Sequence, residues 1–109
     1  MPFSNLEQFS AAIQKGAVEW HRHALERMLE RGIARRDVMD VLLTGDVIEE
    51  YPTDYPYPSV LMLGKPHGMP LHVVAAFDDD LKTVYIITAY SPDVLHFLDD
   101  YKTRRTYYE

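Results

Sequence analysis

The sequence predicts an α+β domain in which N-terminal helices, two of them forming a helical hairpin, pack on a four-stranded antiparallel sheet. Up to Gly45, apolar residues recur at the spacing of helix faces. From Asp46 onwards they alternate or form short runs bounded by turn residues, as strands do. A run of helices followed by a run of strands is typical of an α+β domain. Short turns between consecutive strands favour antiparallel pairing.

The length fits one domain. A chain of 109 residues, 47% apolar and 26% charged, has the size and balance of a single globular unit. We therefore expect one domain over residues 1–109, with a core at about 4–98 and a flexible C-terminal tail at 99–109.

Helix boundaries are marked by capping and stop signals. Ser4 and Glu7 have the spacing of a capping box, and Gly32 is a natural C-terminal stop. The predicted helices cover about 4–15, 19–31 and 35–43.

The strands follow a change of period after Gly45. Proline-rich loop 51–58 separates two of them, since proline is excluded from helices and central strands. The predicted strands are 46–51, 59–64 and the two arms of a hairpin within 70–92, whose turn is acidic.

Charge and composition exclude several classes of protein. Without cysteine, disulfides and thiolate metal sites are ruled out. No apolar run approaches the ~20 residues of a membrane helix, and the first residues lack the pattern of a secretion signal. We therefore expect a cytoplasmic protein with no membrane contact.

Basic residues are clustered although the net charge is −6. Blocks 22–36 and 102–105 hold five and three of the eleven Lys and Arg residues. Nucleic-acid binding normally uses a basic surface, so this clustering is compatible with RNA as a partner.

Neither a metal nor a cofactor is expected. His21 and His23 are two residues apart, which points their rings in different directions on a helix. His67 and His72 add imidazoles, but nothing matches a zinc spacing, a phosphate loop or a serine-hydrolase elbow.

A polar stripe is predicted on the second helix. His23, Arg27 and Arg31 follow one another at steps of four residues and so share one face. Such a stripe could hold phosphate oxygens, because arginine offers a planar fork of donors. The alternative is a solvated face whose glutamates pair with the arginines.

A second polar group is predicted in the hairpin. If the turn leaves Asp78 opposite Lys82, His72 pairs with Thr88 and Tyr90 lies beyond it on the same face. Histidine suits proton transfer near neutral pH. The alternative is a half-buried histidine bonded to the threonine hydroxyl.

Three stretches carry a family resemblance: "HALERMLERGIARRDVMDVLLTGDVIEEYP", "PLHVVAAFD" and "VYIITAYSPD". They resemble the family known as domain of unknown function 4258, over roughly residues 20–105. The recurring polar positions of that family fall here on His23, Arg27, His72, Thr88 and Tyr90.

The family is similar, more remotely, to the RelE- and BrnT-like toxin ribonucleases, which implies a RelE- or barnase-like fold and metal-free RNA cleavage. In this resemblance His72 or His23 is the base or acid, with Tyr90 in the same site. Arg27 and Arg31 hold the phosphate, and Thr88 and Tyr90 orient it. A late basic pair, Arg104 and Arg105, closes over the substrate. The implied partners are RNA and an antitoxin protein.

A non-catalytic module is the rival function. Loop 51–58 is rich in tyrosine and proline. Tyrosine provides large contact area at interfaces, so this loop is a candidate surface for a protein partner.

Overall fold

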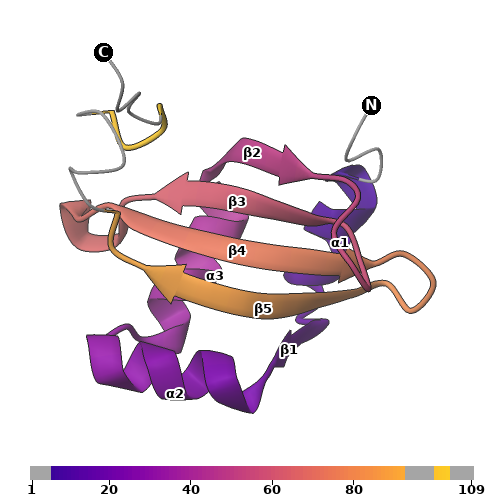
Figure 1. Ribbon diagram of the computed structural model, residues 1–109, viewed down its shortest axis with the longest axis horizontal. Helices are drawn as coiled ribbons and strands as arrows, with labels where there is room; N and C mark the ends of the chain where they lie inside the picture. Colours follow the sequence, from indigo (N-terminus) through magenta and orange to yellow (C-terminus); the bar gives the residue numbers. More distant parts are fainter. Residues whose placement is uncertain (1–5, 93–99, 104–109) are drawn as a thin grey trace.

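The protein, described over residues 6–92 and 100–103 by a computed structural model, is an α+β fold with its helices on one side of a mixed sheet (Figure 1). The helices are α1 (Leu6–Gln14), α2 (Arg22–Arg31) and α3 (Arg35–Thr44), with the short 3-10 helix η1 (Pro66–Gly68). The strands are β1 (Val18–Trp20), β2 (Asp46–Tyr51), β3 (Ser59–Gly64), β4 (Leu71–Asp78) and β5 (Thr83–Tyr90). They form one five-stranded sheet in the order β1-β5-β4-β3-β2.

The prediction of four antiparallel strands missed β1. Its residues Val18 and Trp20 pair in parallel with Val84 and Ile86 of β5, and the other neighbouring strands are antiparallel. The predicted second helix therefore begins too early at Glu19, because that residue lies in β1. β-branched and aromatic side chains favour a strand at this point.

The helices α2 and α3 do not form the predicted hairpin. α2 packs along β5, whereas α3 packs on β3 and β4 and against α1. Gly32 ends α2 in the left-handed conformation, with φ 69°, which redirects the chain between the two helices. The start predicted for the first helix at Ser4 lies outside the described residues.

The hydrophobic core lies between the helices and the sheet. Each helix buries one face there, and alternate residues of the central strands meet them. The cluster consists of Phe9, Ala12, Ile13, Ala24, Met28, Val38, Val41, Leu42, Val60, Met62, Leu71, Val73, Ala75, Phe77, Val84, Ile86 and Ala89. Leu29 of α2 does not belong to this cluster and is 83% exposed.

Pairing between β4 and β5 differs from the predicted register. Asp78 pairs with Thr83, so the connecting loop is one residue longer than expected. A bulge between Ala75 and Val74 then absorbs Ile87, and His72 faces Tyr90 instead of Thr88. The two shifts together amount to an even number of residues. His72, Thr88 and Tyr90 therefore remain on one face, as predicted.

Part of the sheet face opposite the helices is also buried. Leu61, Leu63 and His72 point to this side and are almost fully buried. Residues 100–103 lie over its end (Figure 1), where the Tyr101 carbonyl contacts His72. Within the described ranges, no helix is long and apolar enough to cross a membrane.

Candidate functional site

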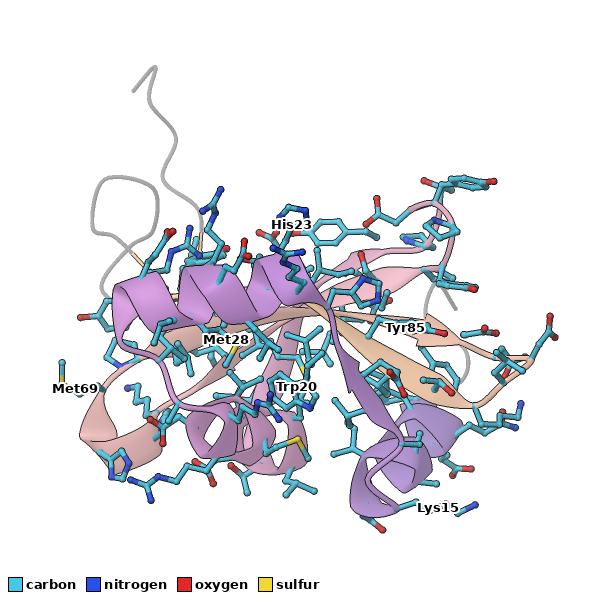
Figure 2. The ribbon with its side chains drawn as sticks, turned by 90° about the horizontal axis from the view of Figure 1, so that it is seen from below. Lys15, Trp20, His23, Met28, Met69 and Tyr85 are labelled. Carbon is cyan, nitrogen blue, oxygen red and sulfur yellow. The ribbon has the colours of Figure 1, made fainter. Side chains whose placement is uncertain are left out.

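The predicted stripe on α2 is at the surface, with partners of its own. The His23 side chain is 93% exposed, and Arg27 donates to Glu30 across 3.2 Å. His23 lies on the opposite side of the helix from the buried Met28 (Figure 2). Arg22 also donates to Glu26. The pairing of glutamates with arginines, which was the alternative to a phosphate clamp, is therefore present on α2.

Arg31 leaves this stripe and binds the sheet. Its Nη1 donates to the Ala89 carbonyl at 2.9 Å and to the Thr88 hydroxyl at 3.2 Å. Thr88 therefore accepts from Arg31, and the structure brings these two predicted site residues together. In this position Arg31 ties the end of α2 to the end of β5.

His72 is enclosed in the protein. None of its surface is exposed, and its Nε2 donates to the Tyr101 carbonyl at 2.7 Å. The Tyr90 ring packs against it, with centroids 5.3 Å apart and planes at 68°. His72 and Tyr90 are thus together, but buried His72 shares no surface with exposed His23. Arg104 and Arg105 lie outside the described residues.

A different group of residues lines a hollow in the described part of the chain, which we call the aromatic pocket. It has a volume of about 410 Å³ on the sheet face opposite the helices. Such a volume is typical of ligand-binding clefts. The lining residues are His21, Asp54, Tyr55, Pro56, Tyr57, Ser59, Ala76, Tyr85 and Ile87.

The floor of the aromatic pocket is one row across three strands. Ser59 pairs with Ala76, and Ala76 pairs with Tyr85. The small side chain of Ala76 leaves space between its larger neighbours. Regular strand pairing therefore fixes the shape of the floor.

Loop 52–58 forms the wall of the pocket and is anchored at both ends. Near its start, the Asp54 amide donates to the Tyr51 carbonyl at 3.2 Å. At its end, Phe77 N–H donates to the Pro58 carbonyl at 3.0 Å. The Ser59 hydroxyl also donates to Asp54 Oδ2 at 2.5 Å, which holds this carboxylate beside the floor.

Three rings line the pocket in a fixed arrangement. Tyr57 and Tyr85 stack with centroids 5.4 Å apart and planes at 9°. His21, immediately after β1, meets Tyr85 edge-on at 5.4 Å. Tyr85 lies beyond the N-terminal end of α2 in Figure 2. Tyr55, at 94% exposure, adds a fourth ring that is free to contact a ligand.

A buried carboxylate supports the tyrosine stack. Asp78 is 5% exposed, and its Oδ1 accepts the N–H groups of Asp80 and Leu81. It also accepts a hydrogen bond from Tyr57. This bond, together with the negative charge of Asp78, raises the pKa of Tyr57 above its usual 10.0. Tyr57 therefore stays a neutral phenol at physiological pH.

The sequence drew attention to the loop but missed Tyr85, His21 and the row beneath them. Tyr85 was visible as a large aromatic residue in the predicted second arm of the hairpin. The position of His21 depends on the parallel pairing of β1, which no local pattern indicates.

A smaller pocket of about 180 Å³ adjoins Arg31. It is lined in part by Asp37, His67 and Ser91. His67 Nε2 and Asp37 Oδ1 are 3.1 Å apart, and the His67 side chain is 71% exposed. An accessible imidazole therefore lies beside a carboxylate in the pocket that Arg31 borders. Among the described residues, no group of three His, Asp or Glu side chains could hold a metal ion.

The fold and pockets define a small α+β protein with an aromatic recess on its sheet. The family described as Domain of unknown function (DUF4258) matches residues 20–91, more than half of the 109-residue chain. The chain therefore belongs to this family. The matched part begins at the last residue of β1 and ends just after β5. No curated protein and no solved structure matches the chain.

Proposed function

We propose that this protein is a non-catalytic binding module that holds a segment of a protein partner in the aromatic pocket. The observation that carries the proposal is the pocket itself, about 410 Å³ between the tyrosine-rich loop and the sheet. Exposed tyrosines beside a recess are typical of the anchoring points of protein interfaces.

Preorganisation also supports binding at this place. The loop is anchored by main-chain hydrogen bonds, and Tyr57 is held by Tyr85 and Asp78. A surface that is already ordered loses less conformational entropy when it binds.

Peptide selection tests the module directly. Random peptides displayed on phage are selected on the immobilised protein, and the enriched peptides are measured against Tyr55→Ala. Tyr55 is 94% exposed, so its truncation should leave the fold intact. Leu29→Ala, at an 83% exposed site on α2, is the matched control.

The expected result is peptides that bind the wild type and Leu29→Ala equally but bind Tyr55→Ala several-fold more weakly. Enrichment of no peptide, or of peptides indifferent to Tyr55, would remove the basis for the proposal.

A second candidate is a metal-independent, toxin-like endoribonuclease held by an antitoxin in the cytoplasm. It is favoured by the contact between Arg31 and Thr88 and by the His67–Asp37 pair in the pocket that Arg31 borders. Arginine could stabilise phosphate charge and the imidazole could move a proton. The acid, base and phosphate-binding roles of His72, His23, Arg27, Tyr90, Arg104 and Arg105 belong to this candidate.

Cleavage of mixed cellular RNA in excess chelator tests the second candidate. Arg31→Gln and His67→Gln should abolish cleavage if the pocket beside Arg31 is the site. Arg22→Gln, which removes an 88% exposed arginine outside that pocket, should not. His72→Ala and Arg27→Ala test the site expected from the resemblance. A folded wild type that leaves RNA intact, with and without ribosomes, would exclude this function.

A further inference from the structure

We infer that the occupant of the aromatic pocket is an arginine side chain of the partner segment, an inference that rests on the proposed binding function. The reasons are the charge of the pocket, the geometry of its rings and the position of its carboxylate.

Charge selects a cation. Asp54 lines the pocket, and none of the described lining residues is Lys or Arg. The hydrogen bond that Asp54 accepts comes from the neutral Ser59 hydroxyl, so its negative charge is not compensated by this contact. The net charge of −6 adds a general attraction for basic segments.

A second negative charge, that of Asp78, lies next to Tyr57. Asp78 accepts from Tyr57 and from two main-chain amides, and all three donors are neutral. Its hydrogen bond to Tyr57 places electron density on the phenol. Both effects make the ring array more attractive to a cation.

Ring geometry favours a planar cation. Tyr57 and Tyr85 are nearly parallel, with 9° between their planes, and Tyr55 is 94% exposed at the rim. A guanidinium can lie flat on a tyrosine face while its N–H groups point in the ring plane. Those N–H groups could then reach the Asp54 carboxylate in a two-point contact, which an ammonium cannot form.

The test uses a defined probe. A short capped peptide with one arginine between glycines is titrated into the 15N-labelled protein and followed by NMR. The comparison peptides carry citrulline, a neutral side chain of nearly the same shape, or lysine. Shifts of the Tyr57 and Tyr85 resonances report the pocket.

We expect the arginine peptide to shift these resonances and to bind about tenfold more tightly than the citrulline peptide, the ratio typical of losing one charge-assisted contact. Lysine should bind more weakly than arginine. Equal binding of arginine and citrulline, equal binding of arginine and lysine, or shifts confined to other surfaces would each overturn the inference.

Two neutralising variants separate local charge from net charge. Asp54→Asn keeps an oxygen to accept from Ser59 but removes the charge, and should weaken the arginine peptide about as much as citrulline does. Asp40→Asn changes the net charge equally on α3, in the helical layer, and should have no effect. If both variants lose the same affinity for the arginine peptide, the peptide is attracted by the net charge of the protein and not by the aromatic pocket, which would overturn the inference.

The phage selection distinguishes failure of the arginine inference from failure of the proposed binding function. If phage selection yields Tyr55-dependent peptides that contain no arginine, the binding function stands and the arginine inference fails. If selection yields no such peptides, the binding function fails first.

Discussion

Tyr57 and Tyr85 stack with 9° between their ring planes, although one belongs to the loop after β2 and the other to β5. Loop 52–58 connects β2 to β3, and β4 lies between β3 and β5 in the sheet. The stack therefore joins the loop to a strand that is not adjacent to either of the strands it connects. It thus adds a side-chain contact across the aromatic pocket to the main-chain hydrogen bonds that anchor the loop.

Truncating the loop ring tests this contact. Tyr57→Ala removes the stack and the hydrogen bond to Asp78, and should lower the free energy of unfolding. Tyr57→Phe keeps the stack and should cost less. Urea denaturation of the two variants measures the difference, and equal losses would show that the hydroxyl, not the stack, holds the loop.

Titration of Tyr57 should respond to Asp78. The hydrogen bond to Asp78 and its negative charge raise the pKa of Tyr57 above 10.0, so Asp78→Asn should lower it. NMR of 13C-labelled tyrosine, assigned with Tyr57→Phe, follows the change. Because the pKa of Tyr57 is raised on folding, its contribution to stability is present below pH 10.0 and is lost as pH rises through the folded value. An unchanged pKa in Asp78→Asn would contradict this account.

The turn at residues 100–103 should open in acid. N–H groups of Thr103 and Lys102, and then the Thr103 hydroxyl, lower the pKa of Asp100 from 3.8 to about 2. A lowered pKa contributes stability above 3.8 that is lost as pH falls through about 2. The Thr103 amide resonance should therefore move with a midpoint at a pH of about 2, and Asp100→Asn should abolish the movement. A resonance that titrates identically in Asp100→Asn would assign the effect to another group.

Close packing of α3 on β3 requires Gly64. A Cβ there would lie 2.8 Å from Val41 Cγ2, so Gly64→Ala should destabilise the protein by about 1–3 kcal/mol. In a Val41→Ala background, where that methyl group is absent, the same change should cost less. Thermal or urea unfolding of the four combinations measures the coupling, and strictly additive losses would place the strain elsewhere.

Two arginines of α2 should differ in their contribution to stability. Arg31→Gln loses the bonds to Ala89 and Thr88, and should cost about 1 kcal/mol or more. Arg27→Gln loses only the exposed pair with Glu30, worth about 0–1 kcal/mol. Urea unfolding compares the two variants. Equal costs would mean that Arg31 does not anchor α2 to the sheet.

Much of the fold could be predicted because its signals are local. The change of period at Gly45, the proline-rich loop and the acidic turn each mark a boundary within a few residues, and four of the strands were found in this way. β1 was not predicted because it has only three residues and its partner, β5, is more than sixty positions away. No periodic pattern can be recognised in so short a strand.

The site was harder to predict than the fold. The spacing of His23, Arg27 and Arg31 correctly gave one helix face, but it could not indicate that Arg31 would turn to the sheet. His72 contacts the Tyr101 carbonyl, which is 29 positions away in the sequence and meets it only in the folded chain. The register error came from the loop around Lys82, where φ is 51°, and from a bulge that sequence alternation does not show.

The parallel pairing of β1 with β5 has a consequence for how the protein forms. Val18 pairs with Val84, so the sheet edge formed by β1 can be completed only after β5 has been synthesised. Contacts of such long sequence separation slow folding, because the loop must close before they contribute. The β2–β3–β4 meander, built from neighbouring strands, can assemble earlier. We therefore expect the order of folding to run against the order of synthesis, with the N-terminal segment among the last parts to dock.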